Sequence, residues 1–234
     1  MDTVKISWSG GKDSTMSVVQ HLRDGDHCKV VCYIPMLDDS IPLIRRDHYE
    51  FIRKMEVVFS RDGADVFIIH GCSFDSFVRK ITTRGPNKGK PFGAAVNVQM
   101  RPGFCGFKRD SKVKALSSFA LTYDYEDIGI AFDEVLRQKQ LTDKKRSILI
   151  ERRITEAQAL DECKRLGFLS PIYNDQERDG CAICPFAKKG ELQRWINSWG
   201  DEARAKLLEI ESFCRENRPD RVPLRDYKWW SDVL

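Results

Sequence analysis

A glycine-containing loop near the start of the chain, Ser9–Ser14, carries the residues best suited to bind an anion. Its two adjacent glycines allow a sharp turn and bring bare N–H groups close to a ligand. The apolar run Val4–Trp8 precedes the loop, and a helical pattern over Thr15–Leu22 follows it. A helix N-terminus adds partial positive charge and Lys12 a full one. The loop therefore predicts a phosphate site, with Ser14 as the first helical cap and a donor to phosphate.

Cysteines form a second candidate site. Cys181 and Cys184 are separated by two residues, with a glycine before and a proline after them, so two thiolates can bind one metal or cluster. Cys105 is the best third ligand, because it lies in an irregular loop before a basic run that favours a thiolate. Three interpretations of these cysteines are open: an iron–sulfur cluster, a zinc ion with a fourth ligand, and uncoordinated thiols. Cys72 is a candidate fourth ligand.

Strand-like runs alternate with helical patterns, which predicts a parallel sheet covered by helices. Strands are expected at Val4–Trp8, Lys29–Ile34, Asp65–Ile69 and Asp127–Ala131. Helices are expected at Asp47–Ser60, Ser73–Ile81, Asp110–Leu121, Thr155–Leu166, Lys189–Trp199 and Glu202–Cys214. The predicted fold class is α/β, a doubly wound parallel sheet. We expect a nucleotide-binding domain over 1–150 and, packed with it as one unit, a helical portion over 151–234 that carries the Cys-x2-Cys loop.

The distribution of charged residues along the sequence is more informative than the net charge of +4. Between Arg79 and Lys114 lie ten Lys or Arg residues and a single acid, Asp110. This block suits an anionic partner, either a phosphorylated small molecule or a nucleic-acid backbone, and ordinary solvated surface charge is the alternative. The sequence shows no signal-peptide pattern and no apolar run of membrane-spanning length, so we expect a cytoplasmic protein with thiols or metal ligands rather than disulfides.

The loop resembles the SGGxDS signature of the PP-loop ATP pyrophosphatases, in its residues and in its strand–loop–helix context. The cysteine–lysine segment after Cys105, the segment Gly129–Glu134 with Arg137, and the closing segment Pro171–Pro185 resemble the phosphoadenosine phosphosulfate reductase-like branch, so the resemblance extends along nearly the whole chain. It implies an adenine nucleotide alpha hydrolase-like, Rossmann-like fold that uses ATP and Mg²⁺ and releases pyrophosphate. The residues that it places at the nucleotide are Ser9, Gly10, Gly11, Lys12, Asp13, Ser14, Tyr33 and Arg137, of which Lys12, Asp13 and Ser14 would be catalytic.

The resemblance also implies a [4Fe-4S] cluster on Cys105, Cys181 and Cys184, with Zn²⁺ as the alternative. The chain departs from the sulfonucleotide reductases, because it has one cysteine where adenylylsulfate reductases have a pair and lacks the C-terminal Glu-Cys-Gly-Leu-His segment. The expected activity is therefore adenylation of an acceptor followed by sulfur transfer from a donor. A sulfonucleotide reductase and a non-catalytic nucleotide- or nucleic-acid-binding regulator are the alternatives. The acceptor is expected to be anionic, and its identity as tRNA, DNA or a small metabolite is left open. Formation of a homodimer is also left open.

Overall fold

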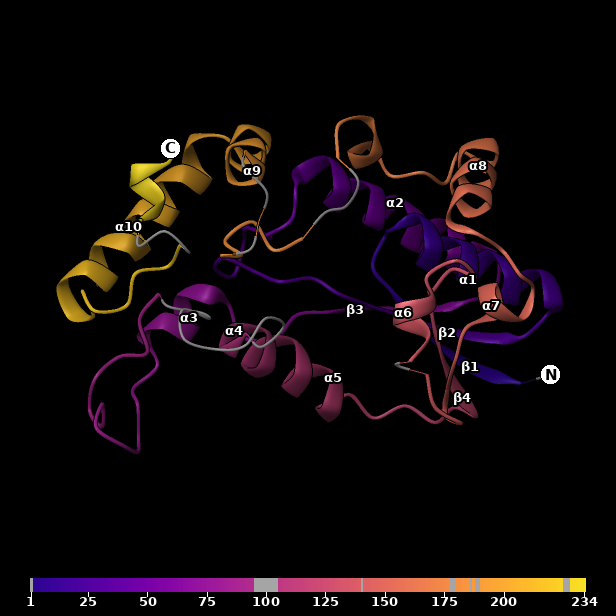
Figure 1. Ribbon diagram of the computed structural model, residues 1–234, viewed down its shortest axis with the longest axis horizontal. Coiled ribbons are helices and arrows are strands. Elements are labelled where there is room, and N and C mark those ends of the chain that lie inside the picture. The colour runs from indigo at the N-terminus through magenta and orange to yellow at the C-terminus, as the bar shows by residue number, and fades with distance from the viewer. Residues whose placement is uncertain are drawn as a thin grey trace. The chain divides into compact units, whose positions relative to one another are not determined.

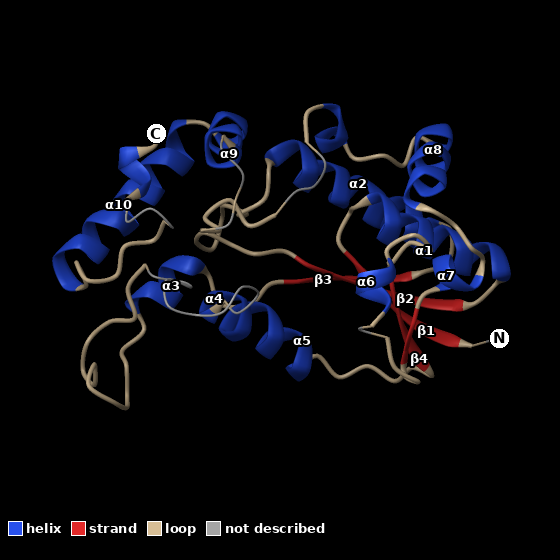
Figure 2. Ribbon diagram, viewed as in Figure 1, coloured by secondary structure: helices blue, strands red, loops and turns tan. Residues whose placement is uncertain are grey.

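The computed structural model describes residues 2–94, 105–139, 141–176, 180–185, 187, 190–224 and 228–234. Its sheet has five strands, all parallel, in the order β3-β2-β1-β4-β5. Figure 2 shows strands β1 to β4 in red. The strands are β1 (Thr3–Trp8), β2 (His27–Tyr33), β3 (Asp65–Ile69), β4 (Tyr125–Ile128) and β5 (Lys145–Arg146). The predicted α/β class with a doubly wound parallel sheet is confirmed.

The order of the strands places β1 at the point where the winding reverses. The chain proceeds from β1 to β2 and β3 on one side and then returns to β4 and β5 on the other. Every second residue of β1 is buried, namely Val4, Ile6 and Trp8. Ligands of open parallel sheets bind beyond the carboxyl ends of the strands at such a reversal. The segments that leave β1 and β4 are therefore in the position to build a site.

The helices vary widely in length. They are α1 (Lys12–Asp24), α2 (Arg46–Arg61), α3 (Phe74–Arg79), α4 (Gly106–Lys108), the π-helix η1 (Arg109–Val113), α5 (Lys114–Ser118), α6 (Val135–Gln138), α7 (Ile148–Glu151), α8 (Glu156–Leu166), the 3-10 helix η2 (Pro171–Asn174), α9 (Glu191–Trp199), α10 (Asp201–Asn217) and the 3-10 helix η3 (Trp230–Asp232). Helix α1 packs against α7 and α8 (Figure 1). Within the described ranges, we find no helix with the length and apolar character needed to cross a membrane.

The observed elements differ from the predicted ones mainly at their ends. Helix α1 begins at Lys12, three residues before the expected pattern, and β4 ends at Ile128 rather than at residue 131. The expected helix over 110–121 opens as a π-helix and ends at Ser118. Strand β5 was not predicted, because two residues carry no periodic signal. Helix α9 is described from Glu191, and the expected start at residue 189 lies outside the described residues.

The chain divides into two compact units, each assembled from three separate segments. Unit 1 comprises 1–33, 47–69 and 120–179 and contains the whole sheet. Unit 2 comprises 34–46, 70–119 and 180–234, and its core gathers Phe74, Phe77, Trp195 and Trp230. The boundary expected at residue 150 does not coincide with this division, because α8 and η2 belong to the same unit as the sheet.

Candidate anion-binding site

The loop between β1 and α1 is shaped by a glycine that the fold requires. Gly10 has φ +75°, and a Cβ atom there would lie 2.6 Å from Cε1 of His48. The His48 side chain is buried, with its Nε2 atom 3.1 Å from the Ser9 carbonyl oxygen and its Nδ1 atom 2.7 Å from the Ser170 hydroxyl. Helix α2 thus supports the outside of the loop. No ligand-like spacing marks this histidine in the sequence.

Ser14 closes the loop from inside the first turn of α1. Its hydroxyl accepts a hydrogen bond from the Ser9 N–H at 3.2 Å and donates to the Gly11 carbonyl at 3.1 Å. The expectation that Ser14 caps the helix is wrong, because Gly11 occupies the N-cap without a side-chain bond. A Cβ atom on Gly129, which follows β4, would lie 2.5 Å from the Ser14 backbone nitrogen. Glycine at this position therefore lets the end of β4 approach the start of α1.

The Lys12 ammonium lies between two carboxylates of unit 1. Its Nζ atom is 2.8 Å from Asp13 Oδ2 and 2.8 Å from Glu156 Oε1. Burial alone would lower the pKa of Lys12, but the hydrogen bonds and charges of these two acids outweigh it and raise the pKa. The lysine is therefore charged, and a phosphate that binds it must displace or share these partners.

Three carboxylates meet at this point. Asp13, Glu134 and Glu156 each offer an oxygen within 4.8 Å of the others. Burial raises the pKa of the Asp13 carboxyl, and the charges of Glu134 and Glu156 add to the effect while Lys12 opposes it. Arg137 lies 2.7 Å from both carboxylate oxygens of Glu134. Three acids against the two cations Lys12 and Arg137 leave a net negative charge, which favours an additional cation beside any phosphate.

A tyrosine hydroxyl accepts a hydrogen bond from the first backbone N–H of α1. The Lys12 N–H donates to the Tyr173 hydroxyl at 3.0 Å. Burial raises the pKa of Tyr173, although the Lys12 amide opposes this, so the phenol stays protonated and retains its own hydrogen to donate. Tyr173 comes from η2 and lies in the segment Pro171–Pro185, whose resemblance to a known family is noted above. The sequence did not predict its contact with the loop.

These residues line a cavity of about 450 Å³ at the loop. Of the predicted nucleotide residues, the lining includes Ser9, Gly11, Lys12, Asp13, Ser14 and Arg137. Tyr33 lies at the end of β2 and does not line it, and Gly10 shapes the loop from the side of α2. The lining residues beyond the predicted set are His48, Gly129, Glu134, Glu156, Ile172 and Tyr173. A neighbouring cavity of about 520 Å³ shares Lys12, Glu156 and Tyr173.

The predicted metal-binding cysteines all lie in unit 2. Cys105 and Cys181 pack against the hydrophobic core of that unit, and a turn brings the Cys184 N–H to the Cys181 carbonyl at 2.9 Å. The Cys105 sulfur accepts a hydrogen bond from the Lys108 N–H at 3.4 Å. Over the described ranges, the acids Asp13, Glu134 and Glu156 form the one group of three potential ligands within 4.8 Å of one another, so the three sulfurs do not form such a group. All eight cysteines carry thiols rather than disulfides.

Comparisons with known proteins give little beyond this geometry. No protein-family model matches the sequence, and no curated protein matches it. Among solved structures, the chain is similar to a 4-thiouridine synthetase in a complex with RNA and bound ATP, at 13% identity and a TM-score of 0.37. The match covers 92% of this chain and 53% of that one, so the chain spans about half the length of that protein.

Proposed function

We propose that the protein is a PP-loop enzyme that binds ATP, adenylates an acceptor and releases pyrophosphate. The observation that carries the proposal is the cavity at the β1–α1 loop, which Lys12, Ser14 and Arg137 line beside the N-terminus of α1. Such an arrangement stabilises phosphate charge through N–H groups, the helix dipole and full positive charges.

The proposed reaction is a displacement at the α-phosphate. An acceptor oxygen attacks the α-phosphorus, a new P–O bond forms, and the bond to the bridging oxygen breaks, so that pyrophosphate leaves with the electron pair. Lys12 and the loop amides neutralise the charge that develops on the leaving group, which is the largest contribution expected of such a site. Arg137 reaches the same cavity from α6, beyond the end of β4.

Mg²⁺ is the cation that we expect to accompany the nucleotide. The Asp13 carboxylate would hold it, since Asp13 Oδ1 is a buried oxygen without a hydrogen-bond partner among the described residues. Glu134 and Glu156 supply the further oxygen ligands that a hard divalent cation prefers. Bound Mg²⁺ supplies charge neutralisation at the phosphate oxygens and would compete with Lys12 for the same carboxylates.

The loop assignment is tested by Lys12→Ala with Lys54→Ala as the control, because Lys54 is an exposed lysine on α2. We expect Lys12→Ala to lower kcat/KM for pyrophosphate release by roughly 10²- to 10³-fold, since it removes a charge aimed at the developing anion. Lys54→Ala should leave the rate unchanged. Equal rates in the two variants would refute the assignment, with folding of each checked by circular dichroism.

Sulfur transfer to the adenylated acceptor is the finer part of the proposal. A hydrosulfide-type donor would form a carbon–sulfur bond on the acceptor while the carbon–oxygen bond to AMP breaks. Cys105, Cys181 and Cys184 would hold the [4Fe-4S] cluster, which supplies an iron with an open position for the sulfur. Zn²⁺ held by the same three thiolates and a fourth ligand is the alternative.

A further inference from the structure

The segment that follows α3 folds back on itself as a hairpin. The Phe92 N–H donates to the Lys80 carbonyl at 2.9 Å, and the Thr82 N–H donates to the Lys90 carbonyl at 2.9 Å. An antiparallel bridge lies between these two bonds, and glycines with positive φ turn the chain at the outer end. We call the segment Lys80–Phe92 the basic finger. Its paired arms give it a defined shape.

The base of the finger is fixed to the core of unit 2. The buried Arg218 side chain, which is 2% exposed, donates to the Pro91 carbonyl at 2.7 Å. The same guanidinium pairs with both oxygens of Asp220, at 2.9 and 2.8 Å. The Phe92 ring packs 5.3 Å from the ring of Phe77 in the core. The finger therefore presents its side chains from a pre-organised support, which reduces the entropy lost on binding.

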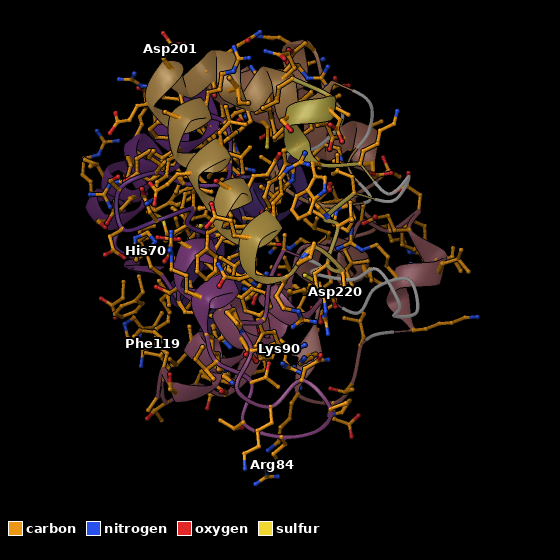
Figure 3. The ribbon with its side chains drawn as sticks, turned by 90° about the vertical axis from the view of Figure 1, so that its left-hand side faces the viewer. His70, Arg84, Lys90, Phe119, Asp201 and Asp220 are labelled. Carbon is orange, nitrogen blue, oxygen red and sulfur yellow. The ribbon has the colours of Figure 1, made fainter. Side chains whose placement is uncertain are left out.

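The outer part of the finger carries positive charge without compensation. Arg84, Lys88 and Lys90 are exposed, and no carboxylate of the described residues pairs with them. The sequence contains no acid between Asp75 and Asp110. Figure 3 shows Arg84 at the outer end of the finger, with its side chain directed away from the ribbon, and Lys90 nearer to the body of the unit.

A second group of cations adjoins the base of the finger. The Asp110 carboxylate, which is buried, accepts contacts from Lys80 Nζ at 2.9 Å, Arg109 Nε at 2.8 Å and Lys114 Nζ at 3.1 Å. Burial would raise the pKa of Asp110, but the three cations hold it well below its usual range. The group keeps a net charge of +2, and its cations remain 45 to 62% exposed. The wide π-helical turn of η1 places Arg109 and Asp110 here.

We propose that this basic face binds the phosphodiester backbone of a nucleic acid, which would make a nucleic acid the acceptor in the proposed reaction. The basic face is defined by Lys80, Arg84, Lys88, Lys90, Arg109 and Lys114. The inference of an acceptor rests on the proposed function, whereas the binding does not. Cations spread along an exposed hairpin suit a linear polyanion, because each can contact a different phosphate.

Other anionic partners fit these residues less well. A small phosphorylated ligand needs several cations around one unoccupied position. Here the Asp110 carboxylate itself occupies the position among Lys80, Arg109 and Lys114. Attachment to a lipid surface usually adds apolar or aromatic side chains that insert, and the tip between Arg84 and Lys90 has none. Protein interfaces rely on buried aromatic or aliphatic anchors, which the tip also lacks.

The test measures binding of a fluorescent RNA hairpin, and of a DNA hairpin of matching sequence, as a function of salt and without nucleotide. We expect the triple variant Arg84→Ala, Lys88→Ala, Lys90→Ala to bind about a hundredfold more weakly near 0.1 M salt. The slope of log K against log[salt] should fall by about 2 to 3, since each lost phosphate contact removes nearly one counterion. The control is Arg53→Ala, Lys54→Ala, Arg61→Ala, which makes the same change of charge on exposed residues of α2.

The outcomes separate this inference from the proposed function. A slope and affinity that change equally in both triple variants would overturn the basic face as a specific surface, and so would binding of neither hairpin. Finger-dependent binding to phosphatidylserine vesicles but not to nucleic acid would also overturn it. Lys12→Ala should bind the hairpin like the unaltered protein. If this variant loses pyrophosphate release but keeps hairpin binding, the loss reports on the β1–α1 loop and not on the basic face. A thermal melt of each variant excludes unfolding as the cause.

Discussion

Lys12 contacts three side chains of its own unit. Its ammonium pairs with Asp13 and Glu156, and its backbone N–H donates to Tyr173. In the proposed function, ATP would exchange these partners for phosphate oxygens rather than occupy vacant donors. Part of the intrinsic binding energy would be spent on this exchange, and a divalent cation on the carboxylates would reduce that cost.

The tyrosine contact leads to a prediction about affinity. Tyr173→Phe removes the acceptor of the Lys12 N–H, a bond worth about 1 kcal/mol. Because phosphate then no longer competes with the phenol, we expect MgATP to bind about fivefold more tightly in isothermal titration calorimetry. Tyr123→Phe, on an exposed tyrosine, should leave the affinity unchanged. Weaker binding by Tyr173→Phe would instead mean that the phenol donates to the phosphate.

At the scale of elements, α1 is coupled to β4 by a buried histidine. His21, near the end of α1, has its Nδ1 atom 2.9 Å from Asp26 and its Nε2 atom 3.2 Å from Asp127. Asp127 is fully buried in β4 and also accepts the Ile148 N–H of α7 at 2.7 Å. Burial would lower the pKa of His21, but the two carboxylates outweigh it and raise the pKa.

This histidine predicts a stability that depends on pH. A folded-state pKa above the unfolded value means that the stabilisation is complete below the unfolded pKa, about 6.5, and is lost as the pH rises through the folded pKa. Urea unfolding of the protein between about pH 6 and about pH 9 should therefore show a falling free energy of unfolding. His21→Gln should be less stable by about 1 to 3 kcal/mol at the lower pH and show a smaller decline. An identical pH dependence in the variant would rule out His21 as its source.

The elements also show what the sequence can and cannot reveal. The strand, loop and helix around Lys12 are adjacent in the chain, so local patterns predicted them together. Glu156 and Tyr173 lie 144 and 161 positions away from Lys12, and only the folding of unit 1 brings them to the loop. The π-helical turn at Asp110 was predicted as a regular helix, because the apolar spacing is helical, and the ion pairs of the buried Asp110 carboxylate with Lys80, Arg109 and Lys114 carry no periodic signal in the sequence.

At the scale of the molecule, the two units differ in the chemistry they can support. Unit 1 contains the whole cavity proposed for the nucleotide, whereas unit 2 contains the basic face and the three candidate ligand cysteines. Adenylation alone would need only unit 1. A requirement for unit 2 would therefore indicate recognition of the acceptor or delivery of sulfur.

The cysteine assignment is tested on the anaerobically purified full chain. We expect iron and inorganic sulfide with a broad visible absorption band, and we expect Cys181→Ser, Cys184→Ser to abolish both. Cys214→Ala serves as the control, because burial raises the pKa of that thiol to about 12 and makes it a poor ligand. One zinc per chain, lost in the double variant, would support the zinc alternative, and metal-free protein would refute both.

The interleaving of the two units has a consequence for biosynthesis. The β1–α1 loop emerges from the ribosome early, but β4 follows only at residues 125–128 and the segment with Glu156 and Tyr173 later still. Translation must pass residue 179 before every part of unit 1 exists. Until β4 has been synthesised, β1 lacks its neighbour on one of its two edges, and an unpaired strand edge on a nascent chain is prone to aggregation.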